Sequence, residues 1–188
     1  MKSLLHITVV LLLVASALAQ QSGAPELYRD ADAYEIYSQL LPDDWSWQGS
    51  RLLLAEATTM VSAPDAGQCF QLQGDQKKKF QEVFDDFTYV NRKAWILLPL
   101  LTINKPYDIV AASQLSDSAG LNWKQQYPGA VSVVTFSAVG FNADRTQALV
   151  FINHQCGSQC SAGTYYLLQE KEGKWQPGRL RVGCAYQS

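Results

Sequence analysis

The sequence predicts an α+β fold in which N-terminal helices pack on an antiparallel C-terminal β-meander of about four strands. In the last third of the chain, short runs of β-branched and aromatic residues alternate with turn residues, as consecutive antiparallel strands require. In the first half, apolar residues instead recur at helical spacing, so helices are available to cover the sheet. No internal repeat, low-complexity tract or linker breaks this order, and we expect one domain over residues 20–188.

Residues 1–19 have the layout of a secretory signal peptide. Lys2 provides a positive charge, the run from Leu4 to Val14 is apolar and uncharged, and Ala17-Leu18-Ala19 is an A-x-A cleavage site. The apolar run is too short to span a bilayer comfortably, although a retained N-terminal anchor is the alternative. We therefore expect cleavage before Gln20 and a secreted or periplasmic domain without stable membrane insertion.

The composition narrows the class of partner. The formal net charge of −2 becomes more negative by one when Lys2 leaves with the signal peptide, and the one basic run, 77–79, is short. A mildly acidic chain without a cationic stripe is not expected to bind nucleic acid or an anionic membrane. The chain also has no phosphate-cradling glycine loop, so we expect no cofactor. The ligands that the composition leaves possible are a protein and a small molecule.

The first predicted helix is amphipathic, and Pro42 ends it. Acidic residues just before it suit the positive end of the helix dipole. A loop over 43–47 and a Leu-rich strand from Leu52 to Thr59 follow. The apolar stripe of the helix consists of Ala33, Ile36, Tyr37, Leu40 and Leu41.

The strongest helix signal covers roughly 76–92, after a surface loop over 62–67. Its aromatic residues predict packing against the sheet rather than a cofactor-binding face, because buried aromatics dominate small cores. The next apolar run, 95–103, is interrupted by Pro99 and is neither a clean helix nor a central strand. A strand over 107–112 and a short helix over 121–127 lead into the meander.

The meander begins after the turn at Pro128 and Gly129. Its second strand is apolar on both faces at its middle, so we expect cover on both sides. Pro177 and Gly178 make the fourth strand irregular and suited to an edge. The four expected strands run from Val131 to Val139, Thr146 to Gln155, Thr164 to Gln169 and Trp175 to Cys184.

The run VGFNADRTQALVFINHQCGSQCSAGTYYLLQEKEGKW resembles the C-terminal signature of a family of uncharacterised exported bacterial proteins. In that signature, VGFN-x3-TQALV leads to CG-x2-C, then to G-x-YY and a charged turn before Trp. The earlier part is similar in its order of elements, including a helix with Asp86-Phe87 and Asn91. The resemblance implies an exported domain and no particular activity. Cys69 and Cys184 lie outside its pattern.

The cysteines predict two structural disulfides. The mature chain has an even number of them, Cys69, Cys156, Cys160 and Cys184, which favours disulfides in an exported protein. Of the three possible pairings, we hypothesise Cys156 with Cys160 across a tight turn, and Cys69 with Cys184. The long bond would stabilise by about 4–5 kcal/mol and the short one by about 2 kcal/mol. A peptide map that linked Cys69 to Cys156 would contradict this pairing.

Two chemical alternatives use the same turn. His154 and Cys156 share a strand face and, with Cys160, could hold a metal ion, although a fourth ligand is missing and C-x-x-x-C is a loose motif. A strained Cys156–Cys160 bond could instead exchange with a partner thiol, but active dithiols usually lie at a helix start. We therefore expect no metal.

Hydrolytic catalysis has few candidate residues. His154 is the one histidine left after signal cleavage, and no G-x-S-x-G motif supplies a serine nucleophile. The carboxylate pairs, Asp43-Asp44 and Asp85-Asp86, are not placed for acid and base roles on one substrate. We assign no catalytic residue. The alternative is a small secreted enzyme, or a thiol or metal site, that uses His154 with Cys156 and Cys160.

The sequence therefore favours an exported, disulfide-stabilised binding or interaction domain. A pocket would lie where the sheet meets the helices, because aromatic side chains offer a large area with a polar edge. The alternative is that these aromatics only pack in the core. The candidate lining is Trp45, Trp47, Trp95 and Tyr127.

Overall fold

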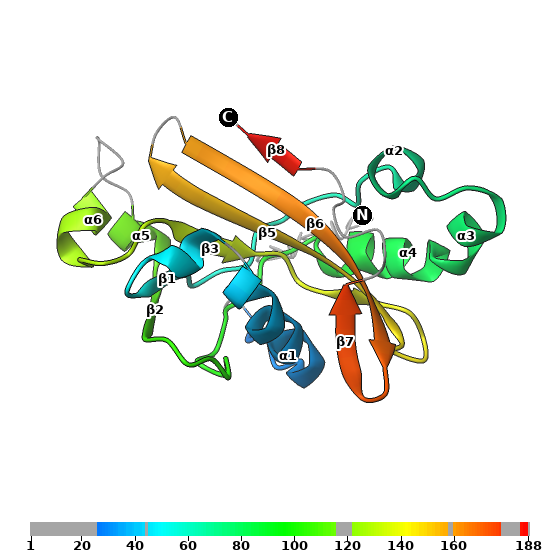
Figure 1. Ribbon diagram of the computed structural model, residues 1–188, viewed down its shortest axis with the longest axis horizontal. Helices are drawn as coiled ribbons and strands as arrows, with labels where there is room; N and C mark the ends of the chain where they lie inside the picture. Colours follow the sequence, from blue (N-terminus) through cyan, green and yellow to red (C-terminus); the bar gives the residue numbers. More distant parts are fainter. Residues whose placement is uncertain (1–25, 44, 116–121, 158–159, 178–184, 188) are drawn as a thin grey trace, which may run out of the picture.

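A mixed β-sheet with helices on both faces forms the molecule (Figure 1). The computed structural model describes residues 26–43, 45–115, 122–157, 160–177 and 185–187, so the expected signal peptide lies outside the described residues. The strand order is β2-β1-β3-β5-β6-β7, with β4 beside β5 and β8 beside β6. The strands are β1 Leu52–Ala55, β2 Tyr107–Val110, β3 Val133–Phe136, β4 Gly140–Phe141, β5 Gln147–Gly157, β6 Cys160–Lys171, β7 Lys174–Pro177 and β8 Ala185–Gln187.

The helices alternate with the strands of the first half of the chain. They are α1 Ala31–Leu40, α2 Ala66–Phe70, α3 Gly74–Lys79, α4 Gln81–Val90, α5 Ala112–Leu115 and α6 Asn122–Gln126. Two short 3-10 turns, Leu41–Asp43 and Trp45–Gln48, follow α1. In the described part of the chain, we find no helix with the length and apolar character needed to cross a membrane.

The predicted α+β class is confirmed, but the sheet is more than a four-stranded antiparallel meander. β1 pairs in parallel with both β2 and β3, whereas β3, β5, β6 and β7 follow one another antiparallel. Pairing between β1 and β2 joins segments that are far apart in sequence, and their short apolar runs carry no signal of strand direction. The sheet is therefore mixed.

Several predicted elements are shorter or divided. The helix expected over 76–92 is two helices, because Phe80 leaves helical geometry at φ −100° and ψ 2°. The strand expected from Val131 to Val139 ends at Phe136 and resumes as β4. The strand expected from Trp175 to Cys184 is represented by β7, and residues 178–184 lie outside the described part of the chain.

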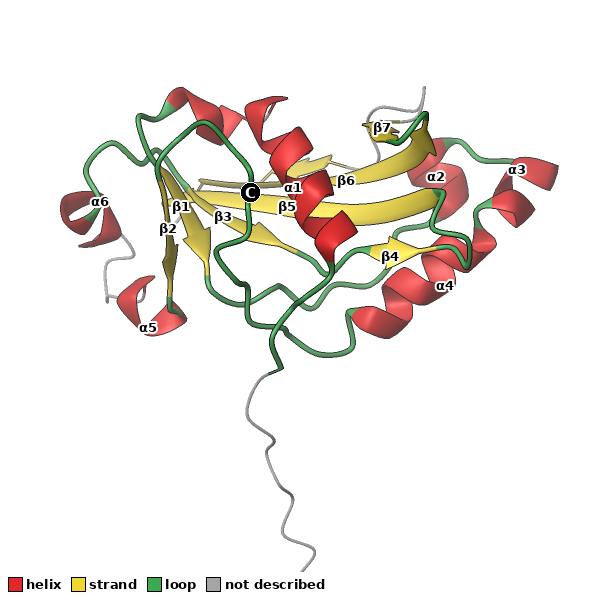
Figure 2. Ribbon diagram, turned by 90° about the horizontal axis from the view of Figure 1, so that it is seen from below, coloured by secondary structure: helices red, strands yellow, loops and turns green. Residues whose placement is uncertain are grey.

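Both faces of the central strand β5 are covered, as its sequence predicts. Val150 and Ile152 pack in one cluster with α1, whereas Leu149 and Phe151 pack in the opposite cluster under α4. A third cluster lies under α6, where Trp123 covers Leu53. Figure 2 shows α1 and α4 against different parts of the sheet, with α5 and α6 next to β2.

The break between β3 and β4 is a buried segment, residues 137–139, which we call the polar joint. Its carbonyl and amide groups bond to side chains from distant helices and from the chain before α1. Tyr37 Oη donates to Ser137 O (2.6 Å), and Tyr28 Oη accepts from Val139 N (2.8 Å). Asn91 accepts from Ala138 N (2.9 Å) and donates to Ala138 O (3.1 Å). Together with the bond from Ser137 N to Phe151 O (2.9 Å), these contacts satisfy most of the buried backbone groups of the polar joint.

Burial at the polar joint affects the acidity of its tyrosines. Removal from water raises the pKa of Tyr28 and of Tyr37 well above the ordinary value, because a buried phenolate has lost its hydration. Burial also raises the pKa of Tyr34, whose hydroxyl donates to Tyr28 O and accepts from Leu98 N. These three hydroxyls therefore stay protonated at neutral pH and serve as structural hydrogen-bond groups.

Next to the polar joint, α4 approaches β4 closely. A Cβ atom at Gly140 would lie 2.4 Å from the Cα and N atoms of Phe87. At the other end of β4, the guanidinium of Arg145 pairs with Asp30 and Asp32, each at 2.6 Å, and lies 3.8 Å from the Phe141 ring centroid. These contacts fix the β4–β5 hairpin to the start of α1.

Candidate functional site

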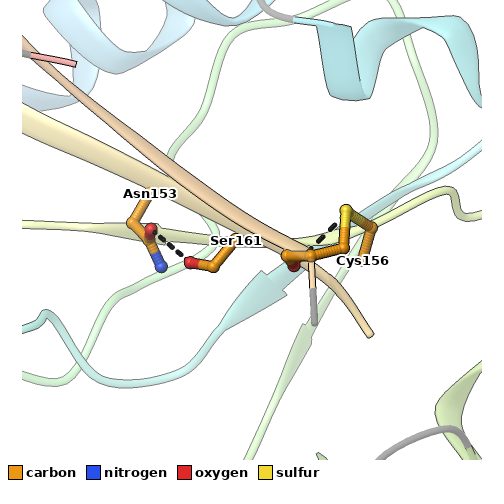
Figure 3. Close-up of a disulfide and its surroundings, with 4 residues drawn as sticks. Asn153, Cys156 and Ser161 are labelled. Carbon is orange, nitrogen blue, oxygen red and sulfur yellow. Dashed lines mark hydrogen bonds between the residues drawn. A yellow bond between two sulfur atoms is a disulfide. The ribbon is translucent and has the colours of Figure 1, made fainter. Parts of the chain in front are cut away.

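The Cys156–Cys160 disulfide joins β5 to β6 at the end of the ribbon where the chain passes from one strand to the other (Figure 3). Its two Cα atoms are 5.2 Å apart, and Ser161 Oγ donates to Asn153 Oδ1 (3.2 Å) beside it. The predicted short bond is therefore present. Cys69 is also disulfide-bonded. Its predicted partner, Cys184, lies outside the described residues, so the long bond stays a prediction.

His154 lies on β5, where it is paired with Val134 and Ala162 on the neighbouring strands and is only 7% exposed. Both sulfur atoms of the nearby turn are in the disulfide, whereas a metal or an electrophile requires the thiolate. Across the described ranges, no group of three or more His, Cys, Asp or Glu side chains is arranged to hold a metal ion. A metal site at His154 would therefore first require reduction of the disulfide.

The four aromatic residues expected to line one pocket are not brought together. Trp47 and Trp95 pack against the cluster on the α1 face of the sheet, and Trp95 Nε1 donates to Val90 O (2.9 Å). Tyr127 packs on the opposite face, in the cluster under α6. The side chain of Trp45 lies outside what the structure describes. Tyr127 is the member of this set that lines a cleft.

That cleft runs along the sheet edge at β2 and has a volume of about 480 Å³. Three separate segments meet there: the apolar run before β2, β2 itself with α5, and the turn after α6. Its walls are therefore drawn from both faces of the sheet. The principal lining residues are Leu97, Pro99, Tyr107, Ile109, Gln114 and Tyr127.

Most of the side chains that line the cleft are apolar, but polar atoms form about half of its exposed surface. Asp108, which lines it, forms an ion pair with Arg51 at 3.2 Å. Gln114 Oε1 accepts from Ala111 N (3.1 Å), which leaves the amide nitrogen for other partners. Tyr107 and Ile109 are half-buried against the α1-face cluster. A cleft that combines apolar side chains with a few directional polar groups can bind a ligand.

A second hollow, of about 600 Å³, lies between α4 and the β4–β5 hairpin, and its lining includes the acidic residues Glu82, Asp85 and Asp86. Its carboxylates already support the fold: Asp86 accepts from Phe141 N (2.8 Å), and Glu82 accepts from Ala143 N (3.4 Å). Arg145, at its rim, is held by two aspartates. These side chains hold the hairpin in place, so we prefer the cleft at β2 as the functional site.

Of the residues predicted to line a pocket, Tyr127 lines this cleft, and the other lining residues of the cleft were not predicted from the sequence. Pro99, which interrupts the apolar run, was the available signal, because it predicts an irregular segment that cannot join the sheet. The position of β2 at the sheet edge was not readable, since it depends on the parallel pairing with β1. Comparisons with protein-family models, with curated proteins and with solved structures gave no match, so the functional argument rests on this geometry.

Proposed function

We propose that this protein is an exported, disulfide-stabilised binding domain and that its ligand site is the cleft along β2. One observation carries the proposal: three segments separated in sequence converge on a cleft of about 480 Å³ at the sheet edge. Small-molecule and peptide sites are typically concave and mostly apolar, with volumes of roughly 300–1,000 Å³ and a few polar groups that orient the ligand. The cleft at β2 has a volume in this range and combines apolar side chains with polar groups, although its exposed surface is about half polar.

The proposal assigns no chemistry to the cleft. Acid–base and nucleophilic catalysis use a nucleophile or proton-transfer group that a second, hydrogen-bonded side chain activates. Asp108 is the charged group of the described lining, and it is paired with Arg51. His154 lies three strands away in the sheet order. The expectation of export rests on the layout of residues 1–19, and a disulfide suits an oxidising compartment.

The thiol alternative has one observation in its favour, because Cys160 is exposed and could be reached by a partner thiol. Against it, the pair connects two strands rather than beginning a helix, so no helix dipole stabilises a thiolate. Reaction of the native protein with a glutathione redox buffer tests it. Exchange that forms a mixed disulfide at Cys160 without unfolding would favour this alternative.

A fragment screen by NMR tests the binding site. The exported chain, with its disulfides intact, is titrated with a library of small uncharged aromatic and aliphatic fragments. We expect shift changes grouped at Leu97, Ile109, Val110 and Tyr127, because these residues line the cleft. Ile109→Asn should abolish them by placing a polar amide in the apolar wall. The matched control is Met60→Asn, at an exposed apolar residue outside the described lining of the cleft. Hits that cluster elsewhere would refute the site.

A further inference from the structure

The backbone of β2 presents two donors and two acceptors away from the sheet. Leu52 N donates to Pro106 O (3.0 Å) and Glu56 N donates to Val110 O (2.8 Å), which sets the phase of the parallel ladder. Along an edge strand, the backbone groups of alternate residues point toward the sheet and away from it, so the N–H and C=O groups of Asp108 point toward β1. The N–H and C=O groups of Tyr107 and Ile109 therefore point outward, and no strand within the described residues lies beyond β2.

The two outer edges of the sheet differ in composition. Proteins protect an edge from additional strands with lysine, proline, bulges or short length. At one edge, β7 contains Lys174 and Pro177. At the other, β2 has the sequence YDIV and neither lysine nor proline. Both strands are only four residues long, but β2 has no lysine or proline within it and is therefore the less protected of the two edges.

The side chains around this edge can receive those of an added strand on both faces. Tyr107 and Ile109 contact the α1-face cluster, and Leu97 and Pro99 lie beside them in the cleft. Val110 belongs to the opposite cluster, toward which Tyr127 also packs. Because side chains of a strand alternate, one set would contact the first wall and the other set the second.

The charges around the cleft select an uncharged partner. Asp108 is the charged residue of the described lining, and Arg51 pairs with it at 3.2 Å, so the two charges offset each other beside the cleft. The neighbouring loop adds apolar surface, since Leu100 is 50% exposed. An uncharged, apolar segment complements this surface.

We infer that the ligand of the cleft is an extended, uncharged and apolar segment of another polypeptide, which binds by adding a strand to β2. This inference rests on the proposed binding function of the same cleft. Main-chain hydrogen bonds to Tyr107 and Ile109 would provide affinity, and the two walls would select alternate side chains.

The test selects peptides and then probes their backbone. A phage-displayed library of random twelve-residue peptides is panned on the exported chain with its disulfides intact. Each selected peptide is made with N-methyl groups on alternate residues, in both phases. One phase should lose affinity by about tenfold or more, because it blocks the hydrogen bonds to β2, and the other should bind almost unchanged.

The variant Ile109→Pro tests the same main-chain hydrogen bonds by changing the protein instead of the peptide. It removes the outward N–H of residue 109 and leaves the bonds from Asp108 and Val110 to β1 in place, so peptide binding should fall. Ile109→Val keeps the N–H and is the matched control. A thermal unfolding scan verifies that both variants fold, and the N-methylated peptides decide the question if Ile109→Pro does not.

The remaining outcomes separate this inference from the proposed function. Peptides that compete with fragments in the cleft, but with equal affinity in both methylation phases, would overturn strand addition and leave the binding site intact. Fragments without peptides would identify a small-molecule ligand. A dimer of the chain that Ile109→Pro dissociates would identify a second copy as the occupant. Neither fragments nor peptides at the cleft would overturn both proposals.

Discussion

Replacing Asn91 with alanine should destabilise the protein by about 2–4 kcal/mol. The side chain makes three hydrogen bonds, but its loss leaves only one of the three partner groups without a hydrogen bond. Two of its acceptors keep another donor: Phe87 O still receives the N–H of residue 91, and Ala138 O still receives Ser137 Oγ at 2.8 Å. Only Ala138 N–H loses its partner, at a cost of about 1–3 kcal/mol. The small cavity left in a side chain only 4% exposed adds about 1 kcal/mol.

The assay is urea unfolding under non-reducing conditions, followed by tryptophan fluorescence and by circular dichroism. Coincident transitions justify a two-state free energy. The matched control is Asn104→Ala at an exposed position, which should change the free energy of unfolding by no more than about 0.5 kcal/mol. If Asn91→Ala falls within that same margin, the account of the polar joint is wrong. A loss well above 4 kcal/mol would show that the other acceptors are not satisfied as described.

Three further predictions concern the same core and the disulfide. Gly140→Ala should cost about 1–3 kcal/mol in urea unfolding, because α4 must move away from β4, and should exceed Gly173→Ala, which has open space but a φ of +75°. Burial raises the folded-state pKa of Tyr28 and Tyr37, so the folded state binds more protons above pH 10. The free energy of unfolding keeps its full value below about pH 10 and should fall above that pH by up to about 1.4 kcal/mol per pH unit for each tyrosine. Tyr28→Phe should make this fall less steep, as measured by circular dichroism of unfolding at several alkaline pH values. An unchanged pH dependence would contradict the assignment to Tyr28. Replacing Cys156 and Cys160 together with serine should cost about 2 kcal/mol by chain entropy, with the cooperative thermal transition retained; loss of that transition would show that the ribbon depends on the bond.

Local features of the fold could be predicted from the sequence where nearby residues determine the backbone conformation or the burial of a strand. Pro42 ended the first helix as expected, since α1 stops at Leu40 and a 3-10 turn follows. The alternation of β5 predicted cover on both faces, because both of its residue sets are apolar. The short disulfide followed from two cysteines across a turn.

Long-range choices were not readable. Nothing in Tyr107–Val110 or Leu52–Ala55 states that these strands pair in parallel, because direction depends on where the intervening chain runs. The polar joint could not be predicted from the sequence, because the residues that bond to it, such as Tyr37 and Asn91, have the helical spacing of ordinary core or surface residues. The cleft followed from these same choices, so only Tyr127 could be named from the sequence.

The polar joint also bears on the order in which the chain folds. Its hydrogen bonds link residues separated by 47, 100 and 111 positions, whereas the β5–β6 ribbon pairs neighbouring segments. Closing long loops costs more chain entropy than closing a hairpin, so the ribbon should form early and the joint late. Interactions that form after the transition state act on the unfolding rate. The hydrogen bonds of the buried tyrosines and of Asn91 should therefore slow unfolding of the native state and have little effect on the folding rate.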